Sequence, residues 1–300
     1  MIFDKNLDVK FEHGVTLALD SGVNVLIQGN LLIEGTKHST VTIRSAIAGK
    51  PYGCFAVVAP DRATKVDLNH VNVSGGSFGN FQGFAFTGQF AIYGANVRIR
   101  NSTFTESAGD DGLNVKYGRV ELDSCKFATN MADQVDLDYC LARVSNCIFS
   151  PSTIDANGDG LDFSGSYASI YMCHFWGFVD KGLSLGERSK ILIQNTNFRE
   201  NYNAVAVKDQ TLSMFNKNRF IDNHRDIISY IKKPFFKSPT IQVTTKPDSL
   251  RIAVVDGDLT EIQNDAFLSN LSVFNKAFTT FTPSLELEFQ LRLTLLIEEK

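Results

Sequence analysis

Apolar and polar residues alternate along most of the chain in short segments that recur at a regular interval. A phenylalanine returns every 22 to 26 residues, and each one is followed by a segment with apolar residues at alternate positions, such as 111–115 and 159–163. The six are Phe104, Phe127, Phe149, Phe175, Phe198 and Phe220. Strand-forming repeats of this length are typical of solenoids, in which each repeat stacks on the next. The pattern therefore predicts an all-β solenoid of parallel strands.

Small side chains recur beside these phenylalanines. Cys125, Cys147 and Cys173 each lie two positions before a repeat phenylalanine. Positions two apart on a strand share a face, so we expect these thiols to point inward with the aromatic rings. Parallel strands orient neighbouring Cβ vectors alike, which suits a disulfide badly. The spacing therefore predicts a buried ladder of unbridged cysteines.

The pattern changes after residue 235. Residues Phe267, Leu271, Phe274 and Phe278 recur at helical spacing, whereas apolar and polar residues alternate strictly over 285–295. We expect a helix and then a long amphipathic strand. The sequence thus predicts a solenoid over 1–235 and a segment, 236–300, that either caps the last coil or forms a homo-oligomer, since an open sheet edge needs a cover.

Charge and hydropathy argue against a nucleic-acid partner and against a membrane-spanning helix. The chain has 33 acidic and 29 basic residues, giving a net charge of -4. A chain with this balance lacks the positive field that neutralises phosphates, so we do not expect nucleic acid as a partner. No apolar run approaches the roughly 18 residues that a membrane-spanning helix needs. We therefore expect no transmembrane segment.

Four segments carry a family resemblance: 110–114 (DDGLN), 180–189 (DKGLSLGERS), 205–209 (VAVKD) and 232–234 (KKP). They resemble the right-handed parallel β-helices of the pectate-lyase-like superfamily, and more specifically the β-helix regions beside CotH-type kinase domains in bacterial surface proteins. The resemblance implies three strands per coil, a right-handed course and an extracellular or cell-surface location. Such helices include lyases, hydrolases, epimerases and inert scaffolds, so the resemblance does not fix an activity.

Aligning the repeats brings polar residues into three columns on one outward face. The first contains Asp111, Asp133 and Asp159, the second Asn114, Asp136, Asp162 and Ser184, and the third Lys116, Asp138, Ser164 and Lys208. Stacked carboxylates repel one another, and their pKa values rise unless a cation compensates. Aspartates fill turns readily, which explains the first column. Strands disfavour aspartate, so Asp136 and Asp162 indicate a site.

A hard cation is one candidate for the compensating charge. Calcium takes six to eight oxygen ligands, which adjacent coils would supply from two columns, although the chain has no EF-hand motif. The candidate calcium ligands are Asp111, Asp133, Asp136, Asp159 and Asp162.

Two kinds of carbohydrate chemistry also fit the columns. Carboxylates on adjacent coils lie ~5 Å apart and those on alternate coils ~9 to 10 Å apart, which brackets the separations in retaining and inverting glycoside hydrolases. A uronate lyase or epimerase would neutralise the sugar carboxylate and remove the neighbouring proton with a base. The candidate catalytic residues are Asp136, Asp162, Lys116 and Lys208, with the lysines as base or charge clamp.

Substrate binding would add four further residues, namely Asn114, Asp138, Lys181 and the only tryptophan, Trp176, on whose ring a sugar would stack. Two hypotheses follow. In the first, the chain binds or processes an anionic bacterial surface polysaccharide through the stacked aspartates, with calcium as a possible cofactor. In the second, it is a noncatalytic β-helix scaffold or interaction module of a larger surface protein.

Overall fold

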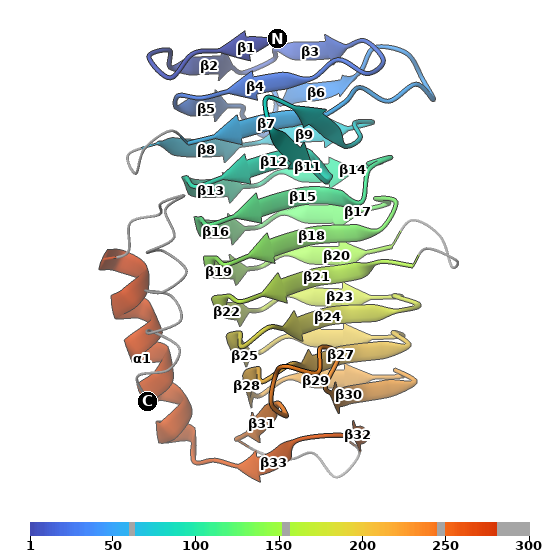
Figure 1. Cartoon of the computed structure of the whole chain (residues 1–300), viewed down its shortest axis with the longest axis vertical. Helices are drawn as coiled ribbons and strands as arrows, with labels where there is room; N and C mark the ends of the chain where they lie inside the picture. Colours follow the sequence, from blue (N-terminus) through green and yellow to red (C-terminus); the bar gives the residue numbers. More distant parts are fainter. Residues whose placement is uncertain (60–63, 152–156, 245–249, 281–300) are drawn as a thin grey trace.

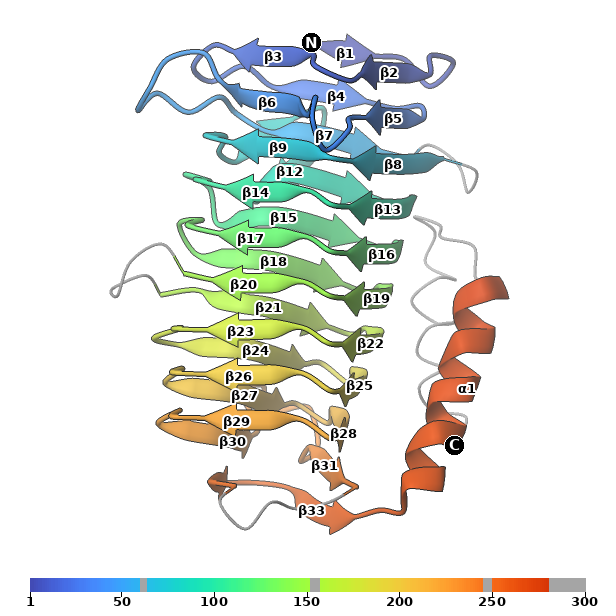
Figure 2. The same cartoon turned by 180° about the vertical axis from the view of Figure 1, so that it is seen from behind.

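The computed structural model describes residues 1–59, 64–151, 157–244 and 250–280. Its strands wind into a solenoid in which three parallel sheets run along the long axis (Figures 1 and 2). One helix lies beside the coils. The predicted all-β solenoid is confirmed.

We name the three sheets A, B and C. Sheet A contains β1 (Ile2–Phe3), β4 (Val25–Ile27), β7 (Phe55–Val58), β12 (Gly88–Tyr93), β15 (Asp111–Lys116), β18 (Asp133–Asp138), β21 (Asp159–Ser164), β24 (Lys181–Gly186), β27 (Asn203–Lys208), β30 (Arg225–Tyr230) and β32 (Ile252–Val254). Sheet B contains β2 (Val9–Glu12), β5 (Leu31–Glu34), β8 (Lys65–Asn69), β13 (Asn96–Arg100), β16 (Arg119–Asp123), β19 (Leu141–Ser145), β22 (Tyr167–Tyr171), β25 (Lys190–Gln194), β28 (Leu212–Asn216), β31 (Thr240–Val243) and β33 (Asp258–Glu261). Sheet C contains β3 (Thr16–Leu19), β6 (Val41–Ser45), β9 (Val71–Ser74), β14 (Thr103–Thr105), β17 (Lys126–Ala128), β20 (Ile148–Ser150), β23 (His174–Trp176), β26 (Asn197–Arg199) and β29 (Arg219–Ile221).

The repeat phenylalanines form one stacked column inside sheet C. Their ring centroids are 4.6 to 5.3 Å apart from one coil to the next. Five of the rings are fully buried, and Phe220 at the end of the column is partly buried. Offset stacking of aromatic rings adds to the free energy of burying them. The predicted inward column is therefore confirmed.

All five cysteines are buried and free. The thiol of Cys125 donates to the carbonyl of Ile99 at 3.4 Å, and that of Cys147 donates to the carbonyl of Ser145 at 3.1 Å. Burial raises the pKa of both thiols well above the usual value. These contacts confirm the predicted ladder of unbridged cysteines.

Single residues in the left-handed region turn the chain between sheets B and C. Their φ values lie between 51° and 55° at Asn101, Ser124, Asn146, Met172, Asn195 and Lys217. Asparagine tolerates this conformation better than most residues, which accounts for three of the six positions. One such residue per coil ends the strand of sheet B and starts that of sheet C, so the bend keeps all coils in register.

The sheets continue beyond residue 235, where the sequence repeat ends. After β30, residues 231–239 interrupt the period, and the side chain of Asp209 holds this segment by accepting from the amides of Lys232 and Lys233 at 2.7 and 2.8 Å. Strand β31 then pairs with β28, and β33 pairs with β31. Because residues 231–239 break the repeat spacing, the sequence period does not predict these last strands.

The helix α1 (Asn264–Thr280) confirms the helix expected from the phenylalanine spacing. Its buried residues Phe267, Phe274 and Phe278 pack on apolar residues of sheet B. These are Leu141, Tyr167, Leu192 and Met214. The helix therefore runs along the side of the coils, and not across the last strand (Figures 1 and 2). The strand expected over 285–295 lies outside the described residues.

A hairpin covers the first part of the outer face of sheet A. Strands β10 (Gly79–Phe81) and β11 (Phe84–Phe86) are antiparallel, and the two-residue turn between them has positive φ at Gln82 and Gly83. Phe86 packs with outward residues of sheet A such as Ala56 and Ala91. The hairpin stands in front of the sheet in Figure 1. Among the described residues, no helix is long and apolar enough to cross a membrane.

Candidate functional site

Sheet A aligns the polar columns on three adjacent strands, β15, β18 and β21. Asp111 pairs with Asp133, and Asp136 pairs with both Asn114 and Asp162. The residues between them, such as Leu113 and Leu137, belong to the core, so the polar side chains point away from it. We call the following set the aspartate–lysine face: Asp111, Asp133, Asp136, Asp138, Asp159, Asp162, Lys116, Lys181 and Lys208.

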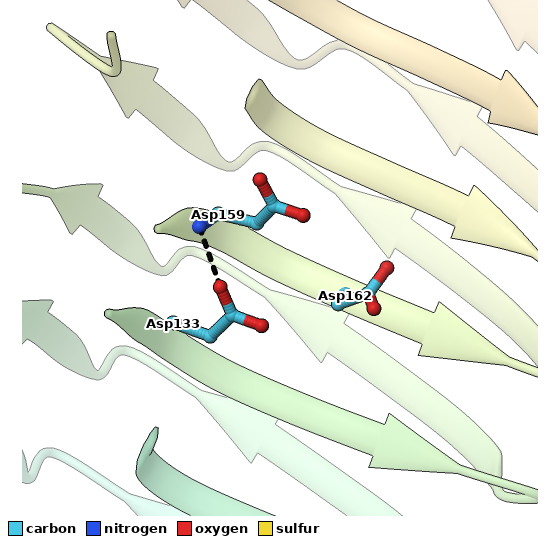
Figure 3. A group of neighbouring side chains, drawn as sticks. All are labelled: Asp133, Asp159 and Asp162. Atoms are coloured by element: carbon cyan, nitrogen blue, oxygen red, sulfur yellow. Dashed lines mark hydrogen bonds between the residues drawn. The ribbon is translucent and has the colours of Figure 1, made fainter. Parts of the chain in front are cut away.

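Three carboxylates of this face come close together. Asp133, Asp159 and Asp162 each offer an oxygen, and these oxygens lie within 4.8 Å of one another. Figure 3 shows Asp133 and Asp159 at the starts of neighbouring strands and Asp162 farther along β21. The backbone amide of Asp159 donates to Oδ1 of Asp133 at 2.6 Å. We call these residues the aspartate trio.

Two lysines flank the trio from the next coils. Nζ of Lys181 lies 2.9 Å from Oδ1 of Asp159 and also contacts Asp180. Nζ of Lys208 donates to Oγ of Ser184 at 2.7 Å and lies 3.7 Å from Oδ1 of Asp162. Among the described residues, that oxygen of Asp162 and Oδ1 of Asp159 are buried and have no hydrogen-bond partner. The trio therefore contains two buried carboxylate oxygens that no described donor satisfies.

The other end of the face has its own pairs. Nζ of Lys116 lies 2.8 Å from Oδ2 of Asp138, and Nδ2 of Asn114 donates to Oδ2 of Asp136 at 2.9 Å. Asp111 accepts a 2.6 Å hydrogen bond from the hydroxyl of Thr87 on the preceding coil and does not belong to the trio.

Burial and mutual repulsion keep protons on this face. Burial raises the pKa of Asp133 and Asp136 well above the usual value, and neighbouring carboxylates raise it further. Burial also raises the pKa of Asp111 to about 7 and that of Asp159 to about 6, with Lys181 partly opposing the shift at Asp159. Near neutral pH the face can therefore bind protons or a cation at little electrostatic cost.

Two lysines on the face, Lys116 and Lys181, act as fixed positive charges. Burial disfavours the charged form of Lys116, but attraction to Asp138 prevails and raises its pKa. The same balance, with Asp159 as the partner, raises the pKa of Lys181. A lysine serves as a base only when it is neutral. Of the two roles considered for these lysines, the electrostatics favour a charge clamp over a base.

The aspartate trio has the donor set of a calcium site. Carboxylate oxygens are ligands that calcium prefers, and oxygens bound to one ion at 2.3 to 2.6 Å lie within about 5 Å of each other. The 4.8 Å limit within the trio meets that condition, and neither Oδ1 of Asp159 nor Oδ1 of Asp162 has a hydrogen-bond donor among the described residues. The residues fit a calcium ion, which would compete with Lys181 and Lys208 for the same oxygens.

Trp176 lies apart from the aspartate–lysine face. It belongs to β23 of sheet C, is 54% exposed, and donates from Nε1 to Oε2 of Glu200 at 2.8 Å. The expected sugar platform is therefore not positioned beside the aspartates. The chain turns from sheet C into sheet A between Trp176 and Lys181, so these two residues lie on different sides of the solenoid.

Two residues beside the aspartate–lysine face were not predicted from the sequence. Tyr93 aligns with Lys116 in the third column, and its ring centroid is 5.9 Å from Nζ of that lysine. Glu187 accepts from the hydroxyl of Ser164 at 3.3 Å and pairs with Lys233. Extending the alignment by one coil would have found Tyr93. Glu187 lies in a turn with positive φ, where strand alternation gives no signal.

The family comparison decides the handedness of the coils. A family model described as "Right handed beta helix region" matches residues 84–240, which is more than half of the 300 residues. The chain belongs to this family. Its solenoid is thus a right-handed parallel β-helix, as the resemblance implied, and the matched residues include the whole aspartate–lysine face. No curated protein matches the chain.

The solved structure of an epimerase agrees with this fold. A double mutant of the periplasmic alginate epimerase AlgG is 10% identical, with a TM-score of 0.59, over 86% of this chain and 76% of that one. An alginate lyase from Paenibacillus sp. str. FPU-7 is 13% identical, with a TM-score of 0.43, over 84% of this chain and 92% of that one. At these identities the likeness shows the fold alone.

Proposed function

We propose that this β-helix binds an anionic, uronate-containing polysaccharide on the aspartate–lysine face and processes it as a lyase or an epimerase. The observation that carries the proposal is the concentration of six aspartates and three lysines on neighbouring strands. Burial raises the pKa of two of these aspartates, Asp111 and Asp136. Perturbed titratable groups of both signs are typical of acid–base sites. The fold shared with an alginate epimerase supports the substrate class.

Lysines and a protonated carboxyl would bind the acidic sugar. Lys116 and Lys208 supply positive charge at two ends of the face, where they would neutralise sugar carboxylates. Asp136, whose pKa burial raises, would be protonated and donate a hydrogen bond or a proton. Asn114, Asp138 and Lys181 would fix the orientation of the sugar. Two carboxyls with different environments can divide acid and base roles between them.

Asp162 would serve as the base. Its side chain is 22% exposed, against 9% for Asp159, whereas its Oδ1 is buried. The other carboxylate oxygen of Asp162 would therefore reach the sugar. Asp162 would take the proton from C5 of the uronate while the lysines stabilise the charge that develops on the carboxylate. In elimination, the C4–O bond then breaks, a C4–C5 double bond forms, and Asp136 protonates the leaving oxygen. In epimerisation, a proton returns to the opposite face of C5.

Calcium would bind at the aspartate trio through one oxygen of each carboxylate, with Asp111 and Asp136 near it, and the second oxygen of Asp162 would take the proton. A bound ion supplies positive charge that further acidifies the C5 proton of a bound uronate. The chain's own contribution is to hold three carboxylates on two strands within reach of one ion. A cation at this place would also relieve the repulsion that raises the aspartate pKa values.

A second candidate function is a noncatalytic β-helix in a bacterial surface protein, as in the regions beside CotH-type kinase domains that the sequence resembles. One observation favours it. Lys116 and Lys181 are already paired with Asp138 and Asp159, so part of the face is neutralised within the chain. In that case residues 236–300 would join copies of the chain or cover its coils.

Product analysis with alginate and pectate tests the proposal. A lyase raises ultraviolet absorbance through the new double bond, an epimerase changes the sugar signals in proton nuclear magnetic resonance, and a hydrolase releases reducing ends without a double bond. We expect elimination or epimerisation in the wild type and its loss in Asp162→Asn. Asp67→Asn, on the outside of sheet B, is the matched control. Absence of all three products and of any binding to either polymer would favour the scaffold.

A further inference from the structure

A shallow, open cavity of about 330 Å³ lies along the turns by which the chain passes from sheet C into sheet A. Its lining comes from three successive coils, at residues 177–179, 200–202 and 222–224. Five of the lining side chains carry hydrogen-bonding groups, namely Glu200, Asn201, Tyr202, Asp222 and His224, and of these Asn201 is buried. A concave site with aromatic walls and a few polar groups is the usual form of a small-ligand subsite.

Exposed rings form one wall of this cavity. The rings of Tyr202 and His224 stack with centroids 4.5 Å apart and planes inclined by 18°. Tyr202 is 46% exposed, and the guanidinium carbon of Arg225 lies 5.4 Å from its ring centroid. Solvent-exposed tyrosine and tryptophan rings combine an apolar surface with a polar group, which suits the mixed surface of a sugar.

Trp176 connects to the same cavity through Glu200. Its Nε1 donates to Oε2 of Glu200, and Arg199 donates to Oε1 of the same carboxylate at 2.9 Å. The hydrogen bonds from Trp176 and Arg199 lower the pKa of Glu200. Glu200 is therefore an ionised acceptor that two donors hold in place at the edge of the cavity. Sugar hydroxyl groups are suitable donors for it.

The cavity lies beside the starts of the strands that continue the first column of the aspartate–lysine face. Tyr202 directly precedes Asn203, which pairs with Lys181 in the first column. Arg225 continues that column on the next coil, because it pairs with Asn203. A polymer lying along the first column from Asp159 would thus pass Lys181, Asn203 and Arg225 with the cavity beside it.

We propose that this cavity is an outlying subsite for one sugar unit of the polysaccharide that binds the aspartate–lysine face. The inference rests on the proposed function and extends it to chain length. Glu200 and Asp222 would accept hydrogen bonds from sugar hydroxyls, and the rings of Tyr202 and His224 would contact the apolar side of the sugar. Arg225 would face the sugar carboxylate, since the two acidic side chains repel it.

The single tryptophan of the chain makes this subsite measurable. A sugar that contacts Glu200 alters the hydrogen bond at Trp176, so long alginate or pectate oligosaccharides should shift the tryptophan emission, whereas disaccharides held at the aspartates should not. Calorimetry on the same samples reports total binding. In Tyr202→Ala we expect affinity for long oligosaccharides to fall roughly two- to tenfold and disaccharide affinity to stay unchanged.

Matched variants separate the possible outcomes. Glu200→Gln should weaken binding of long oligosaccharides as Tyr202→Ala does, whereas Tyr171→Ala, an exposed tyrosine at the end of β22, should not. The subsite would be overturned if long oligosaccharides left the tryptophan emission unchanged and bound Tyr202→Ala as tightly as the wild type. If calorimetry then showed binding that the double variant Asp136→Asn plus Asp162→Asn abolishes, the proposed function would still stand. An emission shift that survives in both subsite variants would also overturn the subsite. No binding of either oligosaccharide would overturn both proposals.

Discussion

The residues that matter most are aspartates placed within strands that disfavour them. Asp136 pairs with Asp162 on the next strand, and Asp133, Asp159 and Asp162 bring their oxygens within 4.8 Å. Each ionised carboxylate there raises the free energy of its neighbours' ionisation. Lys181 and Lys208 compensate only part of this charge. The face is therefore sensitive to pH and to cations.

The pKa of Asp111 gives a direct consequence for stability. Its value is raised from 3.8 to about 7 by burial, so the folded protein binds a proton more tightly than the unfolded chain does. The proton on Asp111 therefore stabilises the folded state fully below pH 3.8. This contribution to the free energy of unfolding, at most about 4 kcal/mol, is lost as the pH rises toward 7. Asp111→Asn should remove this loss. Denaturant titrations at several pH values measure it, and Asp67→Asn is the control.

If the difference in unfolding free energy between wild type and Asp111→Asn did not change across this pH range, the carboxyl would titrate at its ordinary value. Such a result would contradict the burial and repulsion described for the face.

The phenylalanine column makes a second prediction at this scale. Phe149 is fully buried between Phe127 and Phe175, with centroids 5.3 and 4.6 Å away. Phe149→Ala should lower the free energy of unfolding by roughly 3 to 5 kcal/mol, because the cavity cannot collapse without shifting both neighbours. Ile148→Ala, at a side chain 46% exposed on the same strand, should change it little. If urea denaturation showed the same loss of unfolding free energy for both variants, the phenylalanine column would not stabilise the core.

At the scale of elements, the helix α1 protects an apolar strip that the coils leave open. Sheet B carries charged outward residues on its first strands, such as Asp67 and Arg98, and apolar ones farther along, such as Leu141 and Leu192. The buried phenylalanines of the helix pack on the second group, and Phe278 near its end also contacts the guanidinium group of Arg143. Exposed apolar strips of this kind favour association, so the position of α1 follows from the composition of the strands beneath it.

Detaching the helix should expose this strip. Phe274 is buried, and its ring centroid lies 5.2 Å from that of Tyr167. Phe274→Asp places a charge in this contact, so we expect increased binding of an apolar fluorescent dye and faster proteolysis within 264–280. Leu268→Asp, at a residue 45% exposed on the same helix, should leave both unchanged. Equal dye binding in wild type and Phe274→Asp would mean that α1 contributes no cover.

The buried cysteines predict how fast the native protein reacts with a thiol reagent. All five thiols are buried, and burial raises the pKa of Cys125 and Cys147. A thiol reagent should therefore label the native protein very slowly and label five sites after unfolding, because the thiolate is the reactive form. Fast labelling of Cys147 in the native protein would contradict the inward orientation of the column.

At the scale of the whole molecule, periodicity was sufficient to predict the fold. Phe104 to Phe220 gave the spacing of the coils, and Phe267 to Phe278 gave the helix. The last strands escaped because the segment held by Asp209 breaks the spacing before β31. The columns of aspartates could be aligned from the repeat, but their pairing with Lys181 and Lys208 depends on side-chain reach. Trp176 was associated with the wrong side because sequence distance does not show which of three sheets a residue joins.

The most direct measurement is a crystal structure of the protein with a bound uronate oligosaccharide. The central claim is that sheet A carries one site for an anionic polysaccharide between Lys116 and Lys208. We expect electron density for sugar rings along the aspartate–lysine face, with a sugar carboxylate beside a lysine and C5 near Asp162. Sugar density confined to sheet B or sheet C, or a face without sugar in crystals grown at saturating oligosaccharide, would contradict the claim.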